Sequence, residues 1–261
     1  MVATDCPSAG ARSSRTEAAS KKQAGRVACA AMLLSEAQIT SFHRHGYLVV
    51  GPLLPHQDVC ALREALAGLW ERWAAELGVS VADYCRVVSQ WTNLWRVDAR
   101  FAAQLRSHVC TSMAAQLIGS GQVRVFHDHV ISKPPGHSSA VPWHQDYPYW
   151  PIDAPRAVSL WLALDDVTPE SGCMHFMPGA HREGEERAVD FLNDRKDWGT
   201  RSREIVATPV PAGWGVFHHC LSWHTTPENA TPGPRRAYIS IYMDAASAYD
   251  PAHSGWHPMN D

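Results

Sequence analysis

The chain has 261 residues, of which 45% are hydrophobic and 19% charged, and its formal net charge is −3. These values suit one large core in a single domain. They argue against nucleic acid or an anionic membrane surface as the main partner, and the lack of an apolar run of about 18 residues excludes a transmembrane helix.

Residues 1–32 differ from the rest of the chain, because they are rich in Ala, Ser, Lys and Arg and lack a sustained apolar run. We interpret them as a disordered tail or the product of an upstream start codon, since Met32 directly precedes the first patterned segment. The alternative is an organellar transit peptide, which is typically rich in Arg and Ser and poor in acidic residues. The folded domain is therefore expected over residues 33–261.

Helical signals come first in the folded part. Ser35 is a good N-cap and Gly46 stands where a helix would end, before a strand over residues 47–50. Apolar residues at spacings of three and four predict a second helix over residues 59–77 and a third over residues 101–117, with core-packing stripes. Between these two, residues 90–95 combine polar and aromatic side chains in a region expected to be helical.

From Val123 onward the pattern changes from helix to strand, and Pro and Gly punctuate it at residues 134–136. Short strands separated by Pro- and Gly-rich loops continue to Met243, as an all-β sandwich or barrel requires. We therefore predict a mainly β fold, a double-stranded β-helix or cupin-like jelly roll. The N-terminal helices are expected to support one of its sheets.

The seven cysteines are dispersed and odd in number, and no Cys-x-x-Cys pair occurs. This pattern disfavours both a zinc ribbon and a secreted disulfide scaffold. It predicts reduced thiols in an intracellular, cytoplasmic protein.

A candidate metal site begins at His144 and Asp146, which in a strand would point to the same face. A third ligand would come from the late stretch of the chain, where His218, His219 and His224 lie close together. Two histidines and one carboxylate form the facial triad that leaves positions open on non-haem Fe(II). Ten residues separate His224 from Arg235, whose planar guanidinium suits a carboxylate co-substrate.

Other motifs stand in a fixed order between these residues. They are Tyr149, Trp150 and Pro151, the strand-like run 158–166, the segment 170–174 and the segment 178–182. In this order, residues 34–243 resemble the phytanoyl-CoA dioxygenase family of Fe(II)/2-oxoglutarate oxygenases. The resemblance implies a dioxygenase that uses Fe(II), 2-oxoglutarate and O2, supported by ascorbate, to hydroxylate a small-molecule C–H bond with release of succinate and CO2.

The resemblance also implies roles for particular residues. His144, Asp146 and His224 would hold the iron, with His219 as the fallback for the third ligand, and Arg235 would hold the distal carboxylate of 2-oxoglutarate. In a strand, Arg236 would face the opposite way, so one of the two arginines belongs to the site and the other is solvated or paired.

Three further cofactor contacts are implied: Trp161 on the strand after the metal pair, His129 four residues before Lys133, and Asn93 in the polar and aromatic segment. For each of them, packing is the alternative. The carboxylate of Asp146 favours hydroxylation over halogenation, because related halogenases have a small residue at that position. Desaturation, epoxidation and ring closure by the same chemistry stay open.

Two other functions compete with this interpretation. One is a cupin-like protein that binds a metal or a ligand without oxygenase activity, and the other is a hydrolase with zinc on the same ligands. The intact triad and Arg235 favour the oxygenase. No basic patch outside the tail suits the phosphates of an acyl-CoA, so a small molecule or natural-product intermediate is the expected substrate, and the sequence indicates neither its identity nor the oligomeric state.

Overall fold

The described part of the computed structural model, residues 34–136, 138–191 and 203–254, opens with a capped helix, and the expected tail over residues 1–32 lies outside it. Helix α2 (Glu36–His45) starts with a capping box, in which the Gln38 backbone N–H donates to the Ser35 hydroxyl and the Ser35 N–H donates to the Gln38 side chain. Gly46 ends the helix with φ 85°, a conformation that favours glycine. Strand β1 (Tyr47–Val50) follows, as predicted.

The other helices match the apolar stripes with one difference. Helix α3 (His56–Leu77) is the second predicted helix, and α4 (Val81–Tyr84) is a single turn after it. The third prediction, one helix over residues 101–117, is wrong in its continuity: α5 (Ala99–Leu105) and α6 (His108–Ile118) are separate. Ser107 lies between them with a non-helical ψ of 122°, and its carbonyl accepts the Thr111 N–H as α6 begins.

Residues 90–95 do not form an α-helix. Strand β2 (Ser89–Thr92) and the short 3-10 helix η1 (Leu94–Arg96) cover this segment, and Asn93 joins them in a left-handed conformation with φ 59°. The Asn93 N–H donates to the carbonyl of Asp128 on the neighbouring strand β3. A periodicity of two rather than 3.6 therefore governs which of these side chains reach the interior.

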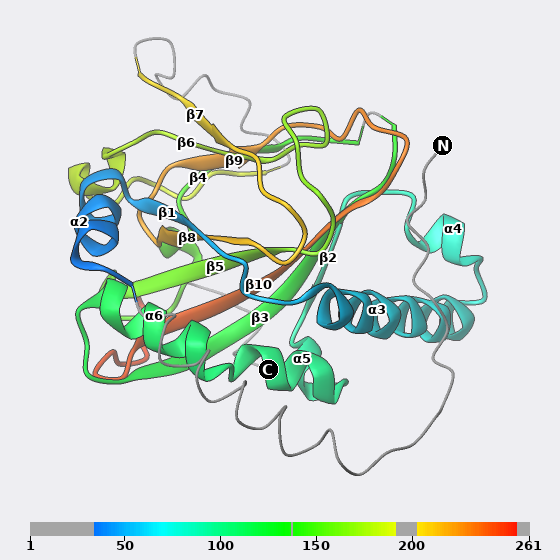
Figure 1. Ribbon diagram of the computed structural model, residues 1–261, viewed down its shortest axis with the longest axis horizontal. Coiled ribbons are helices and arrows are strands. Elements are labelled where there is room, and N and C mark those ends of the chain that lie inside the picture. Colours follow the sequence, from blue (N-terminus) through cyan, green and yellow to red (C-terminus); the bar gives the residue numbers. More distant parts are fainter. Residues whose placement is uncertain (1–33, 137, 192–202, 255–261) are drawn as a thin grey trace, which may run out of the picture.

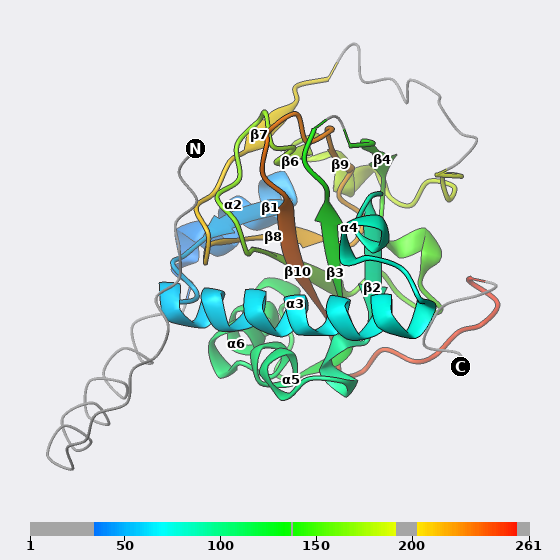
Figure 2. The same cartoon turned by 90° about the vertical axis from the view of Figure 1, so that its right-hand side faces the viewer.

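Two antiparallel sheets make the jelly roll, as Figures 1 and 2 show, which confirms the predicted mainly β, cupin-like fold. The six-stranded sheet has the order β1-β8-β5-β10-β3-β2, and the four-stranded sheet has the order β4-β9-β6-β7. The bounds are β3 Val123–Lys133, β4 Val141–His144, β5 Ala157–Ala163, β6 Met174–Phe176, β7 Val206–Thr208, β8 Gly215–His219, β9 His224–Thr226 and β10 Arg235–Asp244.

The N-terminal helices cover the outer face of the six-stranded sheet, as expected. Helix α3 runs across β10, β3 and β2 in Figure 2, and its Leu66 packs in one cluster with Val130 and Tyr238. Helices α2 and α6 cover the other half of that face. None of the helices within the described residues is both long and apolar enough to cross a membrane.

The inner face of this sheet is set by its register. Ile239 on β10 pairs with His129 on β3 and with Trp161 on β5, and Arg235 pairs with Lys133. Directly opposed residues of antiparallel strands point to the same side, so these side chains all face the second sheet.

The cysteines follow the sequence prediction in part. Cys85, Cys110, Cys173 and Cys220 are free thiols. Cys60 is the exception among the described cysteines, because it is disulfide-bonded.

Helix α3 offers a direct test of the burial that holds the helices to the sheet. Leu66 is 0% exposed and Leu77 is 67% exposed. Leu66→Ala is expected to lower the free energy of unfolding by about 2–5 kcal/mol, because it leaves a cavity under the sheet. Leu77→Ala makes the same chemical change on the same helix and should alter it by less than about 0.5 kcal/mol. Urea denaturation followed by circular dichroism measures both, and equal effects would contradict this account.

Candidate metal centre

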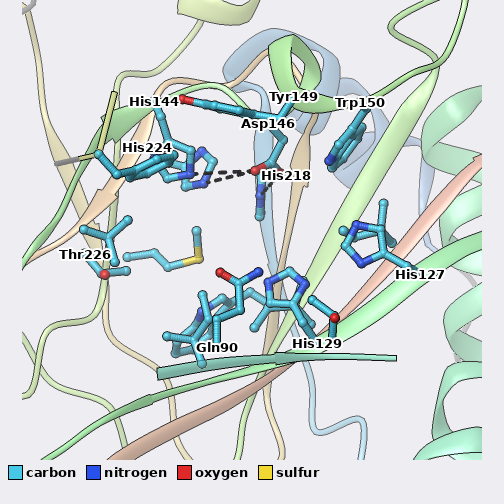
Figure 3. A pocket seen from close by; sticks show the side chains of 18 of the residues that line it. Gln90, His127, His129, His144, Asp146, Tyr149, Trp150, His218, His224 and Thr226 are labelled. Atoms are coloured by element: carbon cyan, nitrogen blue, oxygen red, sulfur yellow. Dashed lines mark hydrogen bonds and ion pairs between the residues drawn. The ribbon is translucent and has the colours of Figure 1, made fainter. Parts of the chain in front are cut away.

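Three predicted ligands meet where the four-stranded sheet faces the interior. His144 ends β4, His224 begins β9, and the two residues pair in register. One carboxylate oxygen of Asp146, Oδ1, lies 3.8 Å from the Nε2 atoms of both histidines. One ligand atom from each residue fits within 4.8 Å of the others, and Figure 3 shows the three side chains converging on one side of a cavity.

Asp146 reaches this point differently from the prediction. Strand β4 stops at His144, and Asp146 has helical backbone angles (φ −76°, ψ −42°) at the start of the 3-10 helix η2 (Tyr147–Tyr149). Its N–H donates to the Cys220 carbonyl beyond β8. A turn at the end of the strand, and not strand alternation, therefore brings the side chains of His144 and Asp146 to the same point.

Both histidines are oriented for metal binding by their own backbone neighbourhood. His144 Nδ1 lies 2.8 Å from the Pro142 carbonyl oxygen, and His224 Nδ1 lies 2.9 Å from that of Ser222. A carbonyl only accepts, so Nδ1 carries the proton in each ring and the lone pair on Nε2 faces the common point. Burial lowers the pKa of both histidines, that of His224 well below its ordinary value, which keeps the rings neutral.

The second oxygen of Asp146 is held by two donors. Oδ2 accepts from the Ser159 hydroxyl at 2.8 Å and from His218 Nε2 at 3.0 Å. Burial alone would raise the pKa of Asp146. The electrostatic interaction with His224 and the hydrogen bond from His218 outweigh burial and hold this pKa below its ordinary range. The carboxylate is thus ionised, with Oδ1 directed at the two imidazoles.

The fallback ligand His219 does not join this group. Its Nδ1 accepts the Leu221 N–H at 3.1 Å, and its ring packs near Phe42 and His181. Burial, followed by the charge of His181, lowers the pKa of His219 to about 4. Adjacent residues on β8 point to opposite faces, which separates His219 from His218.

A cavity of about 430 Å³ opens in front of the three ligands. His129 and Trp161, two of the three predicted cofactor contacts, line this cavity. Asn93 is not among its lining residues, and the Asn93 side chain accepts a hydrogen bond from the Trp95 indole. The other lining residues are Val88, Gln90, Thr92, His127, Ile131, Val141, Tyr149, Trp150, Met174, Phe191, His218, Thr226, Ile239 and Ile241.

Strand geometry explains why Gln90 and Thr92 take the place of Asn93. Thr92 pairs with His129 across β2 and β3, so it shares the inner face, and Gln90 follows at the period of two. Figure 3 shows Gln90 and His129 on the side of the cavity opposite the three ligands. Because the segment was expected to be helical, the period of two that places Gln90 and Thr92 on the inner face was not predicted.

Arg235 is a buried cation whose charged end has no hydrogen-bond partner. It is 1% exposed, and its Nε, Nη1 and Nη2 atoms make no hydrogen bond in the structure. Its guanidinium carbon lies 5.3 Å from the centroid of the Trp161 ring. Burial lowers the pKa of Arg235 to about 10, so it is charged at neutral pH. A buried guanidinium in this state is suited to a carboxylate.

Arg236 is the arginine that lies outside the site and is paired, which is one of the two predicted outcomes. It lies on the opposite face of β10 and donates two hydrogen bonds to Asp165, from Nε at 2.9 Å and from Nη2 at 2.7 Å. Arg63 of α3 contacts the same carboxylate at 3.1 Å. The two adjacent arginines thus divide between an inner site and a paired position under the helices.

Lys133 faces Arg235 in register on the inner face of the sheet. It is fully buried, and its ammonium donates to the carbonyl oxygens of Thr226, at 2.8 Å, and Pro227. Burial, with the nearby charge of Arg235, lowers the pKa of Lys133 to about 6. The Thr226 hydroxyl is buried without a hydrogen-bond partner. The donor set therefore fits a divalent metal at one end and an anionic ligand at the other.

Known proteins resemble this chain in sequence and in fold. The family model described as phytanoyl-CoA dioxygenase matches residues 42–237. L-proline trans-4-hydroxylase of Streptomyces griseoviridis is 30% identical, over 81% of this chain and 87% of that protein. Phytanoyl-CoA dioxygenase 1 of Oryza sativa subsp. japonica is 30% identical, over 85% and 93%. The solved structure of the epimerase SnoN with Fe3+, alpha ketoglutarate and nogalamycin RO has a TM-score of 0.69 at 27% identity, covering 85% of this chain and 87% of its own.

Removal of single imidazoles tests the ligand set. His224→Ala is expected to eliminate tight binding of one divalent metal ion, because it removes one of three ligand atoms within 4.8 Å. His219→Ala should retain the ion, since His219 lies outside the group. Anaerobic calorimetric titration of metal-free protein with Fe(II) measures both, and the reverse result would identify His219 as the ligand.

Proposed function

The chain belongs to the phytanoyl-CoA dioxygenase family and is an Fe(II)/2-oxoglutarate-dependent dioxygenase, and on this premise we propose that it hydroxylates an uncharged small molecule held between its two sheets. The observation that carries the proposal is the convergence of His144, Asp146 and His224 in front of the cavity. These residues would hold the iron. Bound there with 2-oxoglutarate and O2, Fe(II) supplies the oxidising power that puts one oxygen atom into a C–H bond and converts 2-oxoglutarate to succinate and CO2.

For 2-oxoglutarate, we propose that Arg235 forms the anchor. Two parallel hydrogen bonds from its guanidinium to the distal carboxylate would occupy donors that are otherwise buried and unused. The Thr226 hydroxyl would add a third donor, and Trp161 would orient the guanidinium by its cation–π contact. His129 stays a proposed cofactor contact, whereas Gln90 and Thr92 replace Asn93 because they line the cavity.

Oxygen transfer is the favoured outcome at this site. The Asp146 carboxylate would supply the metal ligand that related halogenases lack, which favours oxygen transfer over halogen transfer. Around the cavity, Phe191 packs edge-on to His144 with 4.9 Å between ring centroids, and Tyr149 donates to the Val189 carbonyl at 2.7 Å. These aromatic contacts would help to exclude water from the reacting carbon.

The lining of the cavity indicates the substrate class. Among the described lining residues there is no Lys, Arg or Glu, and Asp146 is assigned to the metal. A charged substrate group would be buried there without an opposite charge, which is costly. Apolar side chains, with Gln90 and His127 as hydrogen-bonding groups, suit a neutral molecule that carries a few polar atoms. A binding protein without oxygenase activity is not favoured, because the triad and Arg235 are both intact.

Turnover of 2-oxoglutarate tests the function directly. Protein supplied with Fe(II), ascorbate, O2 and 2-oxoglutarate is expected to release succinate slowly, and a substrate should accelerate that release. A panel of matched pairs, each a neutral amide or ester and its parent acid, should show acceleration by neutral members. If the protein neither releases succinate nor binds 2-oxoglutarate in calorimetry, the oxygenase assignment is refuted. If only the acids accelerate succinate release, the neutral substrate class is refuted.

The two adjacent arginines form a matched pair for the anchor. Arg235→Lys is expected to raise the KM for 2-oxoglutarate by roughly tenfold or more, because an ammonium cannot make the paired hydrogen bonds. Arg236→Lys changes the same residue type one position along, on the opposite face, and should leave this KM unchanged. Steady-state succinate release at varied 2-oxoglutarate measures both. An equal effect of the two substitutions would refute the assignment.

A further inference from the structure

We propose that His218 is a positioning residue, which acts with Ser159 to hold Asp146 as a one-oxygen ligand and so keeps a neighbouring coordination position open. This inference rests on the proposed function, because it concerns the metal assigned to His144, Asp146 and His224. His218 makes no hydrogen bond to His144 or His224. Its contribution is made through Asp146.

The geometry divides the two oxygens of the carboxylate. Oδ2 accepts two hydrogen bonds, from Ser159 Oγ at 2.8 Å and from His218 Nε2 at 3.0 Å, while Oδ1 faces the two ligand imidazoles. A carboxylate oxygen has two lone-pair sites, and both sites on Oδ2 are therefore in use. Only Oδ1 is available to a metal ion.

Both donors belong to the same rigid surface. His218 on β8 and Ser159 on β5 are partners in register within the six-stranded sheet, so they stand side by side on its inner face. Asp146 arrives from the opposite sheet, after β4. The two hydrogen bonds thus link the ligand of one sheet to the scaffold of the other, and Figure 3 shows His218 next to the Asp146 carboxylate.

His218 is poorly explained as a packing residue alone. It is 2% exposed, and its other ring nitrogen, Nδ1, is buried without a hydrogen-bond partner. Its ring packs against those of Phe176 and His224, with centroid distances of 5.7 and 4.5 Å. An apolar ring would fill this space without leaving a polar atom unsatisfied. What distinguishes histidine here is the N–H that it donates to Asp146.

One-oxygen ligation has a consequence for the reaction. A facial triad leaves three positions, and a chelating co-substrate together with O2 needs all of them. A carboxylate bound through both oxygens would occupy one of these positions. By holding Oδ2, His218 and Ser159 preserve the full set for 2-oxoglutarate and O2.

The test compares variants of His218 with Mn(II) as an air-stable probe of the metal site. His218→Phe keeps the ring volume and removes the donor, and it is expected to weaken Mn(II) binding by about 10- to 100-fold, the usual cost of losing such a partner. At saturating Mn(II), the same variant should also bind 2-oxoglutarate more weakly. His218→Gln retains an N–H donor and should recover most of both affinities. Calorimetry measures the affinities, and thermal unfolding by circular dichroism checks that each variant folds.

His219→Gln is the matched control, because it changes the same residue type on the outer face of the same strand and should leave both affinities unchanged. Wild-type affinities in His218→Phe, or a Gln variant no better than the Phe variant, would overturn the proposal. If His218→Phe fails to fold, Ser159→Ala decides, since it removes the companion donor and must weaken Mn(II) binding. Asp146→Ala distinguishes a failure of the His218 proposal from a failure of the proposed function. Retention of Mn(II) by that variant would overturn the proposed function.

Discussion

The charge on Asp146 is the constraint on which the rest of the site depends. An ionised carboxylate that is partly buried between two sheets loses much of its hydration, which is costly unless polar partners replace the water. Ser159 and His218 supply that replacement on one oxygen. The other oxygen is left facing two neutral imidazoles, an arrangement that a divalent cation would complete.

The inner ends of β3 and β10 pose the opposite electrostatic problem. Arg235 and Lys133 face each other in register and are both buried, so neither is hydrated; burial and the charge of Arg235 lower the pKa of Lys133 to about 6, which leaves Arg235 as the charged partner at neutral pH. Lys133 is satisfied by two backbone carbonyls, but Arg235 keeps its donors unused. An anion would therefore bind at one end of the interior and a cation at the other, and a chelating dicarboxylate is the kind of molecule that can serve both.

Much of this arrangement was predictable from local sequence, because capping, periodicity and motif order are local properties. The capped helix α2, the mainly β fold and the division of Arg235 from Arg236 all followed from such patterns. The break between α5 and α6, the strand β2 and the turn that carries Asp146 did not. His218 was overlooked as a partner of Asp146 because their contact joins residues 72 positions apart, and only the pairing of the sheets brings them together.

Because β2 lies at the edge of the six-stranded sheet, mutations that change the cavity wall can occur apart from mutations that change the metal site. The one strand partner of β2 within the described residues is β3, yet Gln90 and Thr92 form part of the cavity wall. The metal ligands and their hydrogen-bond partners come instead from β4, β5, β8 and β9 and the turn after β4. Mutations on the edge strand can thus reshape the wall while the reactive centre is conserved, so new substrates are accessible to this scaffold without reinvention of its chemistry.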